Sequence, residues 1–300
     1  MSHIAMIRRS QSKYQTSLNM FTAKTIAQIT QKLAEEKKLG KIIAFVPTMG
    51  ALHRGHIALV AQAKQEADIV VVSLFVNRTQ FNDVEDYQKY PRTIEEDVAK
   101  LEACGVDYVF VPSEEEIYPN SDFAFKIIVT KFVDCLCGYT RVGHFDGVAL
   151  VVTKLFNIIN PDIAIFGEKD FQQALVIKKL VRDLNFTVKI LTHEIVREKD
   201  GLALSSRNQR LDEARKIKAA NIFRVLSEIK SEIKVGVDIG DILQKKSIKL
   251  LEMGFEGVDY LEIRDEENLQ LVTDIKSTKN LRIFIAVYLQ GVRLVDNLKI

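Results

Sequence analysis

A short apolar run that turns into a helix at two histidines constrains the fold of this chain more than any other feature. Residues 42–46 are apolar and predict a buried strand, and apolar side chains recur at helical spacing after the turn. The turn, residues 47–56, reads Pro-Thr-Met-Gly-Ala-Leu-His-Arg-Gly-His. Unpaired backbone N–H groups and the helix dipole favour an anion at such a helix start, and Gly50 and Gly55 let the backbone approach it closely. Because His53 and His56 are three residues apart, both can face the same anion, so the pattern predicts a phosphate site.

Three other interpretations of this turn compete with a phosphate site. A histidine at a helix start is often only a capping or solvated residue. Two histidines that follow a strand and a glycine-containing turn argue against that interpretation here. A zinc pair is disfavoured because no Glu follows the first histidine and no Cys or His cluster supplies further ligands. The spacing from Gly50 to Gly55 imitates a P-loop, but His56 stands where that motif requires Lys.

Strands and helices alternate after this turn, which predicts an α/β fold with a parallel sheet and right-handed crossovers. Residues 69–72 are all β-branched and apolar, as in a strand buried on both faces. The expected strands are 42–46, 68–75, 108–111 and 163–166, the expected helices are 55–66, 93–103 and one after Gly147, and 77–92 is expected to be a polar loop.

The chain is predicted to end in a smaller domain that contains both helices and strands. Helices are expected over 212–234 and 238–253, and short strands over 260–263, 283–288 and 292–295, which gives a small α+β unit whose position suggests a lid. We divide the chain into a disordered, basic extension over 1–19, a Rossmann-like domain over 20–195 and a C-terminal lid domain over 196–300.

Two further polar motifs are candidates for the same site. Residues 167–173, Gly-Glu-Lys-Asp-Phe-Gln-Gln, follow another strand, and ligands bind beyond the carboxyl ends of parallel strands. Lys169 would supply positive charge for a phosphate, although a Glu-Lys-Asp turn by itself is usually solvated. Residues 201–208 contain two serines and Arg207, which can wrap a phosphate chain, although a plain polar linker is the alternative.

Composition excludes several classes of partner. Forty-two basic and 40 acidic residues are interspersed, with a net charge of +2, which gives no electrostatic footprint for nucleic acid or an anionic membrane surface. The longest apolar stretch, 69–76, is far shorter than the roughly 20 residues of a membrane span. Three cysteines are too few and wrongly spaced for a zinc site, and their odd number argues against a disulfide framework, which favours a cytoplasmic location and small-molecule partners.

Taken in order, the motifs resemble the pantothenate synthetase family, whose His-x-Gly-His turn is shared with other nucleotidyltransferases. The resemblance runs from about Met20 to Asn297. Besides the motifs above it includes Phe-Val-Asn at 75–77 with Gln80-Phe81, Tyr-Pro-Arg-Thr at 90–93, Gly-His-Phe at 143–145 and Asp-Gly-Leu-Ala at 200–203.

The resemblance implies a two-step ligase that uses ATP with magnesium. Pantoate and ATP would give pantoyl adenylate and pyrophosphate, and the amine of β-alanine would then attack the acyl carbon to yield pantothenate and AMP. A homodimer is also implied.

The same resemblance implies roles for individual residues. His53 and His56 would contact the ATP phosphates, with His56 the usual proton donor, and Lys169, Ser205, Ser206 and Arg207 would hold the β and γ phosphates. The nucleotide pocket would be lined by Met49, Gly50, Gly167, Glu168, Asp170, Val196 and Leu204. Pantoate would be held by Gln80 and Gln173, with Asn77, Tyr90 and Arg141 nearby. Magnesium would travel with ATP, and Asp97 is a candidate for a water-mediated contact to it.

Two departures from the family pattern and two rival functions accompany this interpretation. Arg78 and Val142 stand where the family commonly has proline, so both loops lose a fixed φ angle, which puts loop rigidity and substrate affinity in question. Another small-molecule adenylyltransferase, acting on nicotinamide mononucleotide or phosphopantetheine, would share the histidine turn but not Gln80 and Gln173 in their motifs. A nucleotide sensor without turnover is the other rival, against which intact His56, Lys169 and Arg207 argue.

Overall fold

The computed structural model describes residues 20–119, 124–233, 238–274 and 280–300. The disordered extension predicted over 1–19 lies outside the described residues. Among the described helices, none combines the length and the apolar character needed to cross a membrane.

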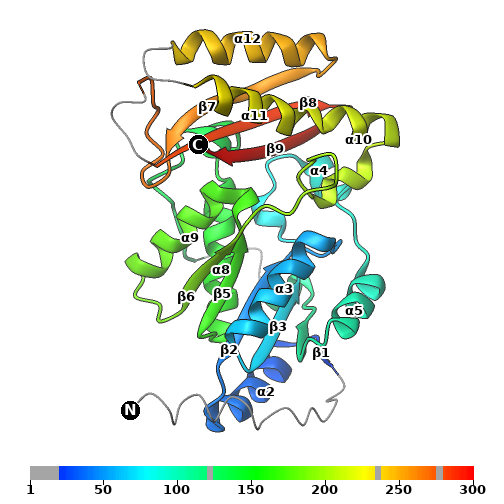
Figure 1. Ribbon diagram of the computed structural model, residues 1–300. Helices are drawn as coiled ribbons and strands as arrows, with labels where there is room; N and C mark the ends of the chain where they lie inside the picture. The colour runs from blue at the N-terminus through cyan, green and yellow to red at the C-terminus, as the bar shows by residue number, and fades with distance from the viewer. Residues whose placement is uncertain (1–19, 120–123, 234–237, 275–279) are drawn as a thin grey trace, which may run out of the picture.

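A parallel sheet of six strands forms the larger part of the molecule (Figure 1). Every neighbouring pair is parallel, in the order β1-β4-β3-β2-β5-β6. The strands are β1 Phe21–Ala23, β2 Ile43–Thr48, β3 Ile69–Leu74, β4 Tyr108–Phe110, β5 Ile163–Gly167 and β6 Lys189–His193. The predicted α/β, Rossmann-like class is therefore confirmed.

Helices cover both faces of this sheet, because successive side chains of each strand point to opposite sides. Phe45 of β2 packs edge-on against Phe156, with ring centroids 6.5 Å apart, on the face covered by α2 Ile26–Lys38, α8 His144–Ile159 and α9 Phe171–Asp183. The next residue, Val46, belongs to the core on the other face, under α3 Arg54–Glu66 and α5 Ile94–Ala103. The result is a three-layer sandwich with buried β2 and β3 at its centre.

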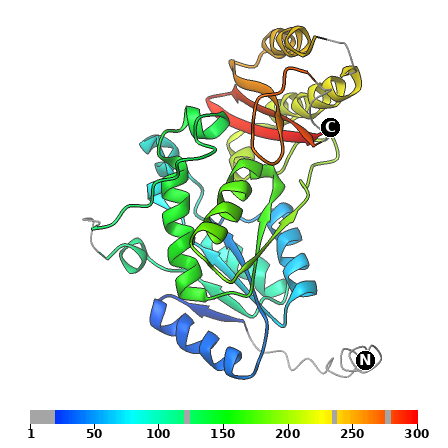
Figure 2. The same ribbon diagram turned by 90° about the vertical axis from the view of Figure 1, so that its left-hand side faces the viewer.

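The C-terminal part has its own core and sits beside the end of the parallel sheet (Figures 1 and 2). Its antiparallel sheet consists of β7 Gly257–Asp265, β8 Leu281–Leu289 and β9 Val292–Lys299. Helices α11 Asn221–Glu232 and α12 Ile239–Glu252 pack on this sheet, and α10 Glu213–Ala219 precedes them. This arrangement agrees with the predicted α+β character.

Several predicted elements need correction. The helix expected over 212–234 is two helices, α10 and α11, separated at Ala220, and residue 234 is not described. The helix expected after Gly147 already begins at His144, because Gly143 takes the left-handed conformation (φ +78°) as its N-cap. The loop expected over 77–92 contains two short helical segments, η1 Arg78–Gln80 and α4 Val84–Gln88. The other short segments are α6 Glu114–Ile117, α7 Leu136–Thr140, η2 Glu168–Asp170 and η3 Ser206–Arg210.

Candidate active site

A cavity of about 480 Å³ lies between the carboxyl ends of the parallel strands and the C-terminal sheet. Thr48, Phe75 and Gly167 line it from the ends of β2, β3 and β5, and Tyr260 and Arg293 line it from β7 and β9. All three predicted motifs meet here. Two of them follow β2 and β5, whose ends share one edge of the parallel sheet, and the third is tied to the first by the hydrogen bond from Ser206 to the carbonyl of Ala51. The cavity contains all the predicted site residues except Gly50, Glu168 and Asp97.

The two histidines are held by hydrogen bonds that determine which ring nitrogen faces the cavity. His53 is the N-cap of α3, and its Nδ1 accepts a hydrogen bond from the N–H of Gly55 at 3.1 Å. The backbone N–H of His53 donates to Nδ1 of His56 at 3.3 Å, and the two rings stack with centroids 4.0 Å apart. With each Nδ1 acting as an acceptor, a neutral ring carries its hydrogen on Nε2. Both Nε2–H groups are therefore free to donate to a ligand.

Both histidines are neutral at physiological pH. Burial, and then the positive charge of Lys169, lower the pKa of His53 to about 4. Burial, and then His53 itself, lower the pKa of His56 to about 3. The pair thus offers hydrogen-bond donors without charge.

Asp97 stabilises the histidine turn through hydrogen bonds to its backbone. Its two carboxylate oxygens accept hydrogen bonds from the N–H groups of Ala51 and Leu52, each at 2.7 Å, and its side chain is fully buried. Gly50 adopts φ +79°, and a Cβ there would lie 3.1 Å from Oδ2 of Asp97, which explains the glycine. Gly50 and Asp97 are not among the residues that line this cavity, and both shape the turn beside it. That Gly50 contacts the nucleotide and that Asp97 approaches magnesium through water stay predictions.

Lys169 reaches the cavity from the short helix η2. Its Nζ lies 3.4 Å from Oδ1 of Asp170, and both residues line the cavity. Burial alone would raise the pKa of Asp170, but Lys169 and Arg207 outweigh it and the pKa is lowered. Glu168 is not among the residues that line the cavity, and its carboxylate accepts hydrogen bonds from Thr192 and Arg282, while its contact with the nucleotide stays a prediction.

Arg207 of the third motif and the nearby Arg210 are paired with an aspartate of the protein itself. Asp86, from α4, accepts hydrogen bonds from Arg207 at 2.7 Å and from Arg210 at 2.9 Å. Burial raises the pKa of Asp86, yet the two arginines hold it below its ordinary value, so the carboxyl is ionised. Ser205 caps η3, and Ser206 donates to the carbonyl of Ala51 at 3.0 Å, which ties this motif to the histidine turn.

The other side of the cavity is built around Gln80. Its Nε2 donates to Sδ of Met49 at 3.2 Å, and its Oε1 accepts from Asn77 at 3.0 Å. Asn77 also donates to the carbonyl of Gly147 and is almost fully buried, so it positions Gln80 rather than offering its own amide. The side-chain oxygen Oδ1 of Asn77 accepts a hydrogen bond from the hydroxyl of Tyr118 at 2.7 Å.

A buried histidine joins Gln80 to Arg141. His144 Nδ1 lies 2.7 Å from the carbonyl oxygen of Gln80, and its Nε2 lies 3.0 Å from Nη1 of Arg141. Because an arginine can only donate, the neutral His144 ring carries its hydrogen on Nδ1. Burial, followed by the charge of Arg141, lowers the pKa of His144 to about 3, in keeping with a neutral ring.

Comparison with known proteins identifies the family to which this arrangement belongs. The family model described as "Pantoate-beta-alanine ligase" matches residues 21–299. The chain belongs to this family. Relatives named pantothenate synthetase include those of Acinetobacter baylyi and Pseudomonas paraeruginosa, each 46% identical over 94% of this chain and 99% of the relative.

Solved structures agree with this assignment. Pantothenate synthetase from Thermus thermophilus matches with a TM-score of 0.85 and 41% identity, covering 93% of this chain and 99% of its own. A pantoate-beta-alanine ligase from Francisella tularensis, described as complexed with β,γ ATP and β-alanine, matches with a TM-score of 0.80 and 37% identity over 93% of this chain and 97% of its own.

Some residues of the site could not be found from the sequence. Asp86 lies in a segment that has the composition of an ordinary polar loop, and Arg293 and Asn297 come from the last strand, without a local motif. Gln172 has no evident role in the sequence beside Gln173, but its side chain is buried. It donates to the carbonyl of Cys135 at 2.9 Å and accepts from the N–H of Cys137 at 3.0 Å. The need of Arg207 for a partner of opposite charge was the only signal that could have suggested an acidic residue such as Asp86.

Proposed function

We propose that the protein joins pantoate to β-alanine with the use of ATP, by way of pantoyl adenylate. The supporting observation is that one cavity is lined both by His53, His56, Lys169 and Arg207, here called the phosphate side, and by the amides of Gln80 and Gln173, here called the amide side. The first step transfers the adenylyl group to the pantoate carboxylate and releases pyrophosphate. In the second step the β-alanine amine displaces AMP.

The phosphate side suits a reaction in which negative charge shifts among phosphate oxygens. Lys169 and Arg207 supply fixed cations, and the Nε2–H groups of His53 and His56 supply donors in fixed orientations. Such preorganised groups stabilise the transition state without reorganisation during the reaction. Because their low pKa values keep both histidines neutral, we assign them hydrogen-bond donation to the phosphates.

The amide side suits a carboxylate that must act as a nucleophile. A tight ion pair to pantoate would lower the reactivity of its carboxylate, whereas the neutral amides of Gln80 and Gln173 can orient it. Orientation of a reactant is worth several kcal/mol, about 7 or more in ideal geometry. Arg141 lines this side, but its guanidinium is engaged with Gln80 and His144.

Magnesium is assigned to ATP and not to a protein site. Within the described ranges, no group of three or more His, Cys, Asp or Glu side chains is arranged to hold a metal ion. We propose that magnesium arrives on the ATP phosphates and neutralises part of their charge, which stays a prediction. The cytoplasmic location and the homodimer stay predictions.

The test is ATP-dependent formation of AMP and pantothenate with pantoate, in the presence and absence of β-alanine. We expect both products together, and only with β-alanine. His56→Ala and Lys169→Ala are expected to lower turnover about a hundredfold or more. His193→Ala and Lys179→Ala, outside the cavity, are the matched controls. ATP binding without turnover would favour a nucleotide sensor, and turnover with another acceptor would favour another adenylyltransferase.

A further inference from the structure

The turn that carries Lys169 is held by a side chain from the opposite domain. Asn297 lies near the end of β9, and its Nδ2 donates to the carbonyl oxygens of Glu168 at 2.9 Å and of Lys169 at 3.0 Å. It is only 2% exposed. Both amide hydrogens of Asn297 are thus used on the backbone of η2.

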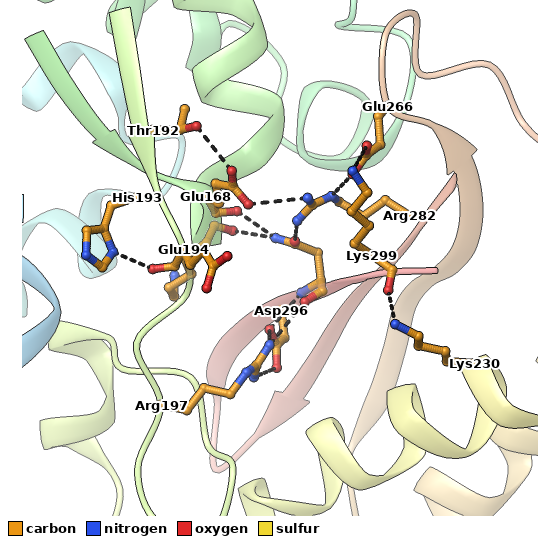
Figure 3. A network of polar contacts seen from close by, with 12 residues as sticks. Glu168, Thr192, His193, Glu194, Arg197, Lys230, Glu266, Arg282, Asp296 and Lys299 are labelled. Carbon is orange, nitrogen blue, oxygen red and sulfur yellow. Dashed lines mark hydrogen bonds and ion pairs between the residues drawn. The ribbon is translucent and has the colours of Figure 1, made fainter. Parts of the chain in front are cut away.

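The orientation of this amide is fixed by an arginine. Oδ1 of Asn297 accepts a hydrogen bond from Nη1 of Arg282, which has donors only, so Nδ2 must be the atom that faces the two carbonyls. Arg282 is itself held, because its Nε donates to Glu266 at 2.8 Å and its guanidinium stacks 4.1 Å over the ring of Phe171. Its Nη2 lies 3.3 Å from Oε2 of Glu168. We call Asn297, Arg282 and Glu168 the clamp, of which Figure 3 labels Arg282 and Glu168.

A second set of contacts anchors the same part of β9 to the segment that joins the two domains. Arg197 donates to both carboxylate oxygens of Asp296, at 2.6 and 2.9 Å, and to the carbonyl oxygen of Asn297 at 3.1 Å. Figure 3 shows Arg197 and Asp296 paired on one side and Arg282 facing Glu168 on the other. Asn297 therefore lies between two ion pairs, each of which has one buried partner, Asp296 in the first and Arg282 in the second.

The Lys169 turn has little support of its own. Helix η2 is three residues long, has no side-chain cap, and contains no buried residue. The side chain of Lys169 makes its polar contact with the adjacent Asp170. The carbonyl groups on either side of the Lys169 Cα accept hydrogen bonds from Asn297. The clamp therefore fixes the backbone position from which the Lys169 side chain extends.

We propose that Asn297 is a positioning residue for Lys169, by which the C-terminal domain places the cation of the phosphate site. The proposal rests on the phosphate role proposed for Lys169. It makes the C-terminal domain part of the adenylation machinery even though Asn297 does not act on substrate through its own amide.

The two half-reactions separate this role from a merely structural one. Lys169 would act on the β and γ phosphates, which leave as pyrophosphate in the first half-reaction. Pantoyl adenylate lacks those phosphates, so its reaction with β-alanine does not need them. Loss of the clamp should therefore slow adenylation and spare amide formation.

The experiment measures both half-reactions in Asn297→Asp, which keeps the shape and the Oδ1 acceptor but replaces the two N–H donors. Pantoate-dependent exchange of labelled pyrophosphate into ATP reports adenylation, and consumption of supplied pantoyl adenylate with β-alanine reports the second half. We expect the exchange kcat to fall at least tenfold, with a smaller change in the ATP KM, and the second half to stay within threefold of the parent enzyme. Asn221→Ala, which removes a hydrogen bond to the carbonyl of Lys218 elsewhere in the C-terminal domain, is the matched control.

A double-mutant cycle completes the test. Added to Lys169→Ala, the Asn297→Asp change should cost less than a further twofold, because its effect acts through the lysine. The proposal would be overturned if Asn297→Asp slowed both half-reactions equally. It would also be overturned if the rate loss of the double variant equalled the product of the losses in the two single variants. If Asn297→Asp does not fold, Arg282→Lys should give the same pattern in weaker form, and a normal pattern there would count against the clamp. Unimpaired adenylation in Lys169→Ala alone would instead refute the phosphate role of the lysine. This result distinguishes failure of the proposed function from failure of the clamp.

Discussion

Gly147 offers the sharpest test of how the amide side of the cavity is built. A Cβ at this position would lie 2.2 Å from the carbonyl oxygen of Thr79 and 2.7 Å from the N of Gln80. These are backbone atoms, so no flexible side chain can move aside. Restoring a separation of 3.4 Å requires a shift of about 1.2 Å between α8 and η1, the difference between 3.4 and 2.2 Å.

That shift has two measurable consequences in Gly147→Ala. Overpacking of this kind costs about 1–3 kcal/mol of unfolding free energy. A displacement of about 1 Å at a substrate-orienting residue costs about a hundredfold in rate, so Gln80 should hold pantoate poorly. We expect kcat/KM for pantoate to fall by about that factor, while ATP affinity changes little because the phosphate side lies on other elements.

The assay is initial-rate kinetics with pantoate varied, alongside urea unfolding. Ala149→Gly, in the same helix, is the control, because it costs about 1 kcal/mol in helix propensity without pushing on η1. It should lose stability and keep its pantoate kinetics. Unchanged pantoate kinetics in Gly147→Ala would refute the claim that α8 fixes Gln80.

Two further predictions concern charge. The pKa of His144 is about 3 in the folded protein and near 6.5 when unfolded, so only the unfolded chain takes up the proton below pH 6.5, and stability is lost as pH falls. His144→Gln should remove on the order of 2 kcal/mol of the stability difference between pH 6.5 and pH 5, measured by urea unfolding, and an unaltered pH slope would contradict this. Asp86→Asn frees Arg207 and Arg210 from their internal anion and should tighten ATP binding several-fold by calorimetry; weaker binding would show that Asp86 helps to hold the nucleotide.

The parallel sheet could be predicted from the sequence because its central strands are continuous apolar runs. Residues 69–72 are buried on both faces in the structure, as their composition predicts. β1 escaped prediction because three residues are too few for a pattern, and β6 because its side chains are half-buried and mixed in polarity.

The motifs predicted where the site lies but not how each side chain is used. The spacing of residues 167–173 placed Lys169 correctly at a strand end, yet it could not indicate that Glu168 turns toward Arg282. Asn297 reaches Lys169 across 128 residues of chain, and no local pattern encodes such a contact. Tertiary packing, and not sequence spacing, selects these partners.

The central claim is that pantoate is adenylated at this cavity before β-alanine reacts. Exchange of labelled pyrophosphate into ATP, measured with pantoate and without β-alanine, tests it most directly. The account predicts exchange that requires pantoate and is lost in Lys169→Ala. Exchange without pantoate, or only when β-alanine is present, would contradict it.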